Sequence, residues 1–231
     1  FPLYSHLFKT MDRRGIEWEV IKGECKGQVR NHEKARCKAK TEWVWRLDDD
    51  NVAEPNLLEK FSKYACDPKI GAIAGVVLHP EVEFHPDCTS SSIKDCLTKY
   101  AVQFSPFKGT LEVEHLYSTF CYRKSAAEHG FPLYLSQVGH REETIFSYEM
   151  FRKGWKLIVD GEAYTWHYRA STGGIRTVNT SKPWEQDEQK FIRKLEQWNV
   201  KVNEYYILIN PNGIGDHWVQ RGLIPLIKQK Y

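Results

Sequence analysis

Apolar residues along the chain alternate between helical spacing and strand-like runs. After Pro55, apolar and aromatic residues between positions 57 and 64 recur at helical spacing, and an apolar run from Ile70 to Leu78 follows them. Similar pairs of a helix and a strand occur before and after this one. The pattern predicts helices at about residues 3–11, 29–39, 55–64, 141–153 and 184–198, and strands at residues 16–21, 42–47, 70–78, 117–122, 156–159 and 163–167.

Helices that alternate with strongly apolar strands are typical of a parallel sheet with helices on its faces. We therefore expect an α/β fold with a mostly parallel central sheet and flanking helices. Ligands of such sheets bind beyond the carboxyl ends of the strands. Residues 79–110 show little periodicity, which predicts a long irregular excursion near that edge and a candidate rim for the substrate.

The last thirty or so residues have a different character. Residues 205–210 have a buried-strand pattern, residues 211–216 form a glycine-containing turn, and residues 217–231 have a helical pattern. We expect one domain over residues 1–200 and a strand–loop–helix tail over residues 201–231, as though a second domain were beginning there.

Charge and composition narrow the classes of function. The 33 Lys and Arg residues nearly balance the 30 Asp and Glu residues and are interleaved with them, which argues against a nucleic-acid partner. The longest apolar run, residues 70–78, is much shorter than the roughly 18 residues of a membrane span. None of the six cysteines forms a C-x-x-C pair, which argues against a zinc site and fits reduced thiols. We expect a cytoplasmic protein without a transmembrane segment.

Three consecutive carboxylates, Asp48, Asp49 and Asp50, follow the expected strand at residues 42–47. At separations of ~4–6 Å they repel one another by more than about 1 kcal/mol unless a cation lies between them. Carboxylate oxygens suit a hard divalent ion such as Mg²⁺ or Mn²⁺, which commonly keeps substrate phosphates among its ligands. The motif predicts a metal and phosphate site, and a solvated acidic turn is the alternative.

Several short motifs follow one another in a characteristic order. They are Arg30-Asn31, Glu42 to Leu47 leading into Asp48-Asp49-Asp50, Gly130-Phe131, Arg141 to Thr144, Gly154-Trp155 and Trp166-His167. In this order they resemble the GT-A glycosyltransferases of family 2, over about residues 1–180. The opening strand of that family would come before Phe1 and is not in this sequence.

The resemblance implies a GT-A fold and a nucleotide-sugar donor that is held through a divalent metal. It implies that Asp50 is the main metal ligand, that Asp48 contacts the metal or the ribose, and that His167 is a possible third ligand. It also places Asp49 in the donor site and makes Arg30 a nucleotide contact. A lone histidine at the end of a strand is also often structural, so His167 keeps that alternative.

The pair Glu142-Glu143 opens the expected helix at residues 141–153. The resemblance implies that this pair supplies the catalytic base, and Glu143 is the better match, although the family usually has Glu-Asp here. Inverting sugar transfer does need one carboxylate to remove the proton of the acceptor hydroxyl. The alternative is structural, because the helix dipole favours acidic residues in the first turn of any helix.

Arg169 and Arg176 flank the glycine pair Gly173-Gly174. A loop of this kind could fold over the donor and place a guanidinium on its diphosphate. Solvated loop charges are an equal alternative.

Residues and resemblance together predict a metal-dependent, inverting glycosyltransferase of the hexosyltransferase type that uses Mn²⁺ or Mg²⁺. It would move a sugar from a nucleotide-diphosphate donor, a UDP-sugar by preference, to a hydroxyl of a glycan or glycoconjugate acceptor during polysaccharide assembly. Two alternatives stay open. One is a phosphohydrolase of the haloacid dehalogenase type that uses Asp48 and Asp50, and the other is an inactive domain that binds sugar nucleotides.

The tail carries a second resemblance. Residues 207–216, followed by a helix that contains Leu223-Ile224-Pro225, are similar to the opening of a heptosyltransferase-like GT-B enzyme of family 9. This resemblance implies a possible second transferase domain in the same polypeptide.

Overall fold

A computed structural model describes residues 5–168 and 180–202 of the chain. The expected tail strand and helix, the family 9 resemblance and the loop arginines Arg169 and Arg176 lie outside these residues. The helices are α1 (Ser5–Arg13), α2 (Gln28–Lys38), α3 (Leu57–Ala65), α4 (Glu142–Arg152) and α5 (Lys182–Gln197), and the strands are β1 (Trp43–Arg46), β2 (Asn51–Ala53), β3 (Ile70–Leu78), β4 (Thr89–Ser90), β5 (Tyr100–Ala101), β6 (Thr110–Val113), β7 (Phe120–Arg123) and β8 (Lys156–His167).

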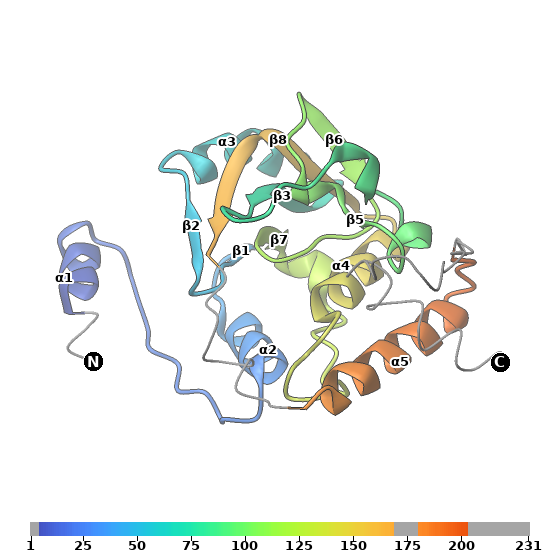
Figure 1. Cartoon of the computed structure of the whole chain (residues 1–231). Coiled ribbons are helices and arrows are strands. Elements are labelled where there is room, and N and C mark those ends of the chain that lie inside the picture. Colours follow the sequence, from blue (N-terminus) through green and yellow to red (C-terminus); the bar gives the residue numbers. More distant parts are fainter. Residues whose placement is uncertain (1–4, 169–179, 203–231) are drawn as a thin grey trace.

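The main sheet is mixed and has the strand order β1-β7-β3-β8-β2, with β6 paired to β8 (Figure 1). The central and longest pairing, between β3 and β8, is parallel. The pairs β1–β7, β3–β7, β2–β8 and β6–β8 are antiparallel. The predicted α/β class is confirmed, and the parallel pair forms the centre of the sheet.

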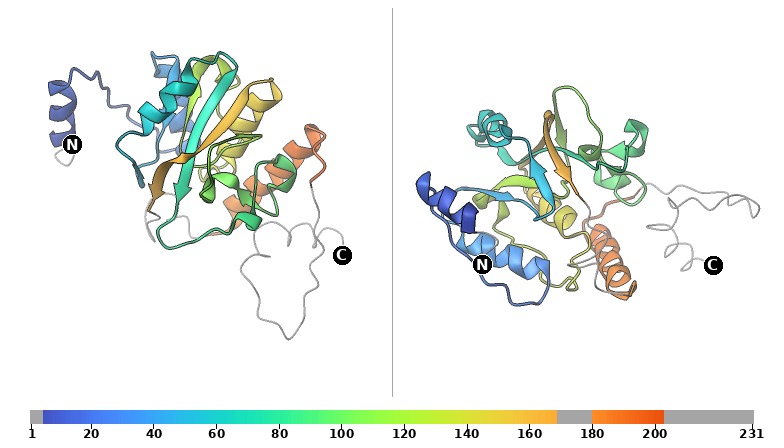
Figure 2. Two further views of the ribbon diagram at one scale, coloured as in Figure 1. Left: turned by 90° about the horizontal axis from the view of Figure 1, so that it is seen from above. Right: turned by 60° about the vertical axis from the view of Figure 1, so that its left-hand side comes forward.

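Helices cover both faces of this sheet, as Figure 2 shows from two sides. Leu57 and Phe61 of α3 pack with Ile73 of β3 in one apolar cluster. Phe146 of α4 and Phe191 of α5 belong to the other cluster, on the opposite face. The buried positions of β3 supply side chains to both clusters, which is why its sequence is a nearly continuous apolar run.

The two strands expected at residues 156–159 and 163–167 form one strand, β8. The ladder between β3 and β8 pairs Gly75 with Asp160 and then Val76 with Tyr164, so residues 161–163 form a bulge. A side chain at Gly75 would collide with the carbonyl of Ala163 in that bulge. The irregular sequence between the two expected strands is therefore an extra loop within one strand.

The strand expected at residues 16–21 is not formed, so this prediction is wrong. Residues 16–24 have no ladder partner, and Ile16, Trp18 and Val20 are exposed. Alternating apolar residues make a strand only where another strand accepts their hydrogen bonds, and the described sheet offers none to this segment. Helix α1 buries no residue and is set apart from the sheet in Figure 1, and the ring of Trp18 stacks on Phe8 instead.

Residues 79–110 form the expected irregular excursion, with the short strands β4 and β5 and several single turns. Its rings pack together beyond the carboxyl end of β3, where His79 contacts Phe84, Phe104 and His167. No helix in the described part of the chain has the length and apolar character that spanning a membrane would require.

Candidate active site

The three aspartates lie where β1 ends and β2 begins, as expected from the sequence. Asn51 of β2 pairs with His167 of β8, and this register brings His167 beside Asp50, with 3.2 Å between Nε2 and Oδ1. Asp48 faces the other way, because its Oδ1 lies 3.5 Å from the guanidinium of Arg46. Asp49 is exposed. Asp48 and Asp50 therefore contact different side chains, Arg46 and His167 respectively.

Arg46 joins the aspartate motif to the acidic pair of α4. Its Nη2 lies 2.6 Å from Oε1 of Glu142, 3.4 Å from Oε1 of Glu143 and 3.5 Å from Asp48. Its Nη1 donates to the carbonyl of Ser118, which fixes the guanidinium on a second side. One buried cation therefore holds carboxylates from α4 and from the segment between β1 and β2, which are almost a hundred residues apart in sequence.

His32 of α2 also reaches this cluster, with its Nδ1 3.1 Å from Oε1 of Glu142. Sequence reasoning missed both His32 and Arg46. The sequence did hold one indication of the role of Arg46. It lies at the end of a strand, two positions before three aspartates, and a charged residue that is buried at such a position needs a carboxylate as its partner. His32 carried none, since it follows Arg30-Asn31 on a polar helix.

Arg30, which the resemblance implied, lies on an exposed part of α2. Among the described residues, its side chain makes no hydrogen bond or ion pair with the acidic cluster. A cavity of about 270 Å³ lies beside the two residues that follow Arg30 in α2. The residues that line it include Ile21, Gly23, Asn31 and His32. His32 thus connects this cavity to Glu142.

The two glutamates have opposite pKa shifts. Burial alone would raise the pKa of Glu142, but the charge of Arg46 and the hydrogen bond of His32 outweigh it, so this pKa is lowered. For Glu143, burial dominates and raises the pKa to about 7, against the pull of Arg46 and with the help of the charges of Glu142 and Asp48. Two neighbouring carboxyls whose pKa values are pushed apart can take different roles, one as a fixed anion and one as a proton acceptor.

Burial separates the two glutamates in the same way. The side chain of Glu142 is wholly buried, whereas 18% of the side chain of Glu143 is exposed. A base must touch its substrate, and of the two glutamates only Glu143 has an exposed part. Helix α4 produces this difference, because consecutive residues of a helix point in different directions.

Asp50 and His167 have donor atoms that fit a divalent ion. A carboxylate oxygen and an imidazole nitrogen at 3.2 Å can share one ion, with water and donor phosphates as the other ligands. Asp48 is turned toward Arg46 instead. Within residues 5–168 and 180–202, no group of three or more His, Cys, Asp or Glu side chains forms a complete metal cage.

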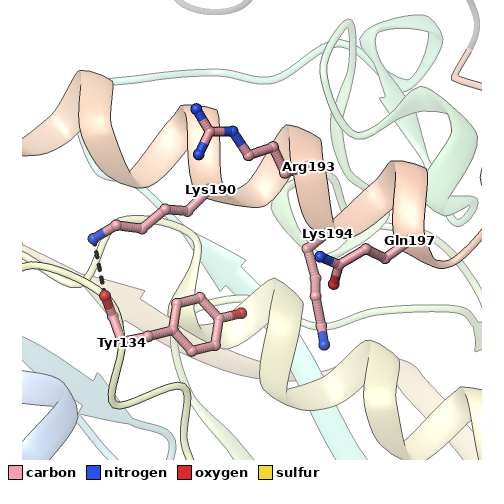
Figure 3. A pocket seen from close by; sticks show the side chains of 5 residues that line it. All are labelled: Tyr134, Lys190, Arg193, Lys194 and Gln197. Carbon is pink, nitrogen blue, oxygen red and sulfur yellow. Dashed lines mark hydrogen bonds between the residues drawn. The ribbon is translucent and has the colours of Figure 1, made fainter.

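A second cavity, of about 260 Å³, lies between α5 and the loop before α4 (Figure 3). Lys190 donates to the carbonyl of Tyr134 and pairs with Asp187, and Lys194 pairs with Glu149. These acids pair with two of the three cationic side chains that line the cavity. The residues that line this cavity are Tyr134, Lys190, Arg193, Lys194 and Gln197. None of them was a candidate site residue from the sequence.

The solved structures that resemble this fold include the following three. S. aureus TarS 1-349 in complex with UDP-GlcNAc has a TM-score of 0.57 at 14% identity over 87% of this chain and 56% of that chain. The mannosyltransferase PcManGT from Pyrobaculum calidifontis, in complex with GDP-Man and Mn²⁺, has a TM-score of 0.54 at 16% identity over 83% and 51%. GalNAc-T7 with UDP, GalNAc and Mn²⁺ has a TM-score of 0.54 at 14% identity over 85% and 40%. The expected GT-A fold is confirmed.

This chain spans about half the length of these structures. A comparison with curated proteins gave no match. The model of the family described as glycosyl transferase family 2 matches residues 8–129, which include α2, the aspartate motif and β3. This match decides against the haloacid dehalogenase alternative. The chain belongs to glycosyl transferase family 2.

Proposed function

We propose that this chain transfers a sugar from a nucleoside diphosphate donor to a hydroxyl of a glycan acceptor, with inversion at the anomeric carbon. One observation carries the proposal. The partly exposed Glu143, with its raised pKa, is joined through Arg46 to the aspartate motif, whose Asp50 forms a carboxylate–histidine pair that fits a metal. A base and a diphosphate site side by side are what glycosyl transfer from a nucleotide sugar requires.

Glu143 acts as the general base. Its carboxylate takes the proton of the acceptor hydroxyl while the hydroxyl oxygen forms a bond to the anomeric carbon of the sugar. On the opposite face, the bond between that carbon and the diphosphate oxygen breaks, and the nucleoside diphosphate leaves with the electron pair. A base with a pKa of about 7 is well matched to neutral pH, because it is partly ionised and still accepts a proton readily.

Asp50 and His167 would hold the divalent ion, Mn²⁺ or Mg²⁺. When bound, the ion would neutralise charge on the departing diphosphate. Asp48 would face the ribose, since Arg46 already draws it away from Asp50. The PcManGT and GalNAc-T7 structures were both obtained with Mn²⁺, which supports this assignment.

The donor is expected to be a UDP-sugar, bound along α2. The cavity beside Asn31 and His32 supports a nucleotide near Arg30. TarS was crystallised with UDP-GlcNAc, GalNAc-T7 with UDP and PcManGT with GDP-Man, so the fold accepts more than one nucleoside. Asp49, Arg169 and Arg176 stay proposed donor contacts. Assembly of a polysaccharide, a cytoplasmic location and a second transferase domain after residue 200 stay proposals as well.

The test is a binding screen followed by a turnover assay. Nucleotide sugars are added with Mn²⁺ or with EDTA, and the unfolding temperature is measured. A donor at 100 times its Kd should stabilise the protein by about 2.7 kcal/mol, and only with the metal. The donor found is then incubated with glycan acceptors, and proton NMR of the product reports the anomeric configuration.

Each outcome is decisive. Release of the nucleoside diphosphate with a product of inverted configuration supports the proposal. Metal-dependent binding without turnover on any acceptor would favour the inactive sugar-nucleotide-binding domain. A lack of stabilisation by every nucleotide sugar would contradict both.

A further inference from the structure

The turn before the acidic pair is held from α5. Asp187 of α5 is fully buried, and its carboxylate accepts hydrogen bonds from Ser136 N at 2.7 Å, Ser136 Oγ at 2.6 Å and His140 N at 3.1 Å. These donors span residues 136–140, which directly precede Arg141 and α4. A single carboxylate therefore fixes the backbone of the turn at both ends.

The next residue of α5, Glu188, holds the same turn through a side chain. Its two carboxylate oxygens accept from Nε and Nη2 of Arg141 at 2.8 and 2.9 Å, and its Oε2 also lies 3.0 Å from Nε2 of His140. Nη1 of Arg141 donates to the hydroxyl of Tyr117 at 2.6 Å and to the carbonyl of Cys96 at 3.2 Å. The guanidinium is thus fixed on every side.

Arg141 has a backbone conformation that needs such support. Its φ of 68° lies in the left-handed region, which costs a residue with a side chain of the order of 1–2 kcal/mol. Helix α4 begins at the next residue, and the amide of Ile145 donates to the carbonyl of Arg141 at 3.0 Å. The conformation of Arg141 therefore sets the direction in which the first turn of α4 points its side chains.

We propose that Asp187 and Glu188 are positioning residues for the catalytic base. They hold the turn at 136–141 in its strained form and thereby aim the carboxylate of Glu143 at the acceptor hydroxyl. This inference rests on the proposed function, because it takes Glu143 as the base. It assigns a role in the chemistry to α5, which lies beyond residues 8–129 that the family model matches.

Docking of α5 alone does not account for this arrangement. A separate set of contacts already attaches α5 to the far end of α4, where Oε1 of Glu149 lies 3.2 Å from Nζ of Lys194 and accepts from Nε1 of Trp198 at 3.2 Å. Asp187 and Glu188 instead bind the turn at residues 136–141, and Asp187 also pairs with Lys190 of α5 itself. The two sets provide a matched pair for an experiment.

The experiment compares Glu188→Gln with the control Glu149→Gln. Glu188→Gln removes the ion pairs of Glu188 with Arg141 and His140, and Glu149→Gln removes those of Glu149 with Lys194 and Arg152. Each variant thus loses a charged contact between α5 and the region of α4, and only the first touches the turn. For Glu188→Gln we expect kcat to fall about 10- to 100-fold with the donor KM changed less than about threefold, because a misplacement of about 1 Å is enough for such a loss. For Glu149→Gln we expect kcat within about twofold of the parent. Glu188→Asp, which keeps the charge, should recover part of the rate.

Ser136→Ala covers the case in which Glu188→Gln does not fold. It removes one hydrogen bond to Asp187 and leaves every charge in place, and kcat should fall severalfold at constant donor KM. If Glu188→Gln and Glu149→Gln lower the unfolding temperature equally and both keep the parental kcat, α5 is only docked and the inference is wrong. The same holds if Ser136→Ala has the parental kcat.

Failure of the proposed function would be recognised separately. If the parent transfers no sugar to any acceptor, Glu143 loses its role as a base, and a crystal structure of Glu188→Gln then judges the positioning. We expect Arg141 to leave the left-handed region and the Glu143 carboxylate to shift by about 1 Å or more. An unchanged turn in that crystal structure would overturn the inference.

Discussion

Two buried arginines lie on either side of the start of α4, and they hold their carboxylates in different ways. Arg46 faces three carboxylates, those of Asp48, Glu142 and Glu143. Arg141 faces one carboxylate, that of Glu188, and binds it through a bidentate pair of hydrogen bonds. The Arg46 cluster therefore has more negative charge than one guanidinium can compensate, whereas the Arg141 cluster is matched.

The pKa values follow this difference. The pKa of Glu188 is lowered to about 2, because the charge of Arg141 and the hydrogen bonds of His140 and Arg141 outweigh its burial. The pKa of Glu143 is raised to about 7 by burial and by the surplus of negative charge around it. The comparison teaches that a buried acid in close contact with a guanidinium, as Glu188 and Glu142 are, is fixed as an anion, whereas a further buried acid beside the same guanidinium remains able to exchange a proton.

The largest expected effect separates the two glutamates of the Arg46 cluster. Glu143→Gln should cut sugar transfer about 10²–10⁴-fold, or roughly 3–5 kcal/mol of barrier, with donor affinity nearly unchanged. Steady-state kinetics and donor titration measure both quantities. Glu142→Gln is the control, and its main effect should be on stability, because it removes a partner from a buried pair with Arg46. Full activity of Glu143→Gln with an inactive but folded Glu142→Gln would exchange their roles.

The second effect concerns stability in acid. Glu188 has a lowered pKa, so its contribution to the free energy of unfolding is present above its ordinary pKa of 4.5 and is lost as the pH falls toward about 2. The difference between these values corresponds to roughly 3 kcal/mol. Urea unfolding of the parent and of Glu188→Gln, measured between pH 6 and pH 2, should show the gap between them shrinking as the pH falls. A constant gap would mean that the Glu188 carboxylate is not held as an anion.

The third effect concerns Glu143, whose contribution to the free energy of unfolding depends on pH in the opposite direction to that of Glu188. Because its folded pKa is raised, the folded protein binds a proton that the unfolded chain does not, so this group favours folding increasingly as the pH falls from about 7 to 4.5. For catalysis the protonated base is idle, and kcat/KM should fall about tenfold per pH unit below about 7. A pH profile of kcat/KM measures this limb. An activity that is flat from pH 5 to pH 8 would contradict the assignment.

The smallest effect tests a group outside both arginine clusters. Asp50→Asn should weaken Mn²⁺-dependent UDP binding by about tenfold or more while leaving the fold intact, since a carboxylate in this loop contributes little packing. Calorimetric titration of UDP with Mn²⁺ and with EDTA measures it. Asp49→Asn, at the exposed neighbouring position, is the control. Equal metal-dependent affinity in the parent and in Asp50→Asn would remove Asp50 from the metal site.

Short-range pattern predicted much of this site. The aspartates follow an apolar strand, Glu142-Glu143 open a helix, and both features can be read within a dozen residues. The contact between Asp50 and His167 also agrees with the resemblance, although it depends on how β2 pairs with β8. The positions of the aspartates and of Glu142-Glu143 were predictable because local periodicity sets the ends of strands and helices.

The long-range partners were not predictable from one sequence. Arg46 meets Glu142 across 96 positions, and Glu188 meets Arg141 across 47. In α5, the acids Asp187 and Glu188 lie among lysines and glutamines and have the pattern of a solvated face, yet both are buried. Likewise, the sequence of residues 16–21 has the pattern of a strand, but pattern alone does not say whether a partner strand is present.

The bulge in β8 has a consequence for errors in strand pairing. When two strands are paired without interruption, a one-residue shift of register at one end shifts every pair up to the other end. Such a shift turns each side chain to the opposite face of the sheet. In β8 the loop at residues 161–163 divides the ladder into two lengths, one paired from Lys156 to Asp160 and one from Tyr164 to Trp166. The second length is also anchored to β2, where Asn51 pairs with His167. A misalignment in the first length can therefore be absorbed at the loop, so that His167 stays aligned with Asp50.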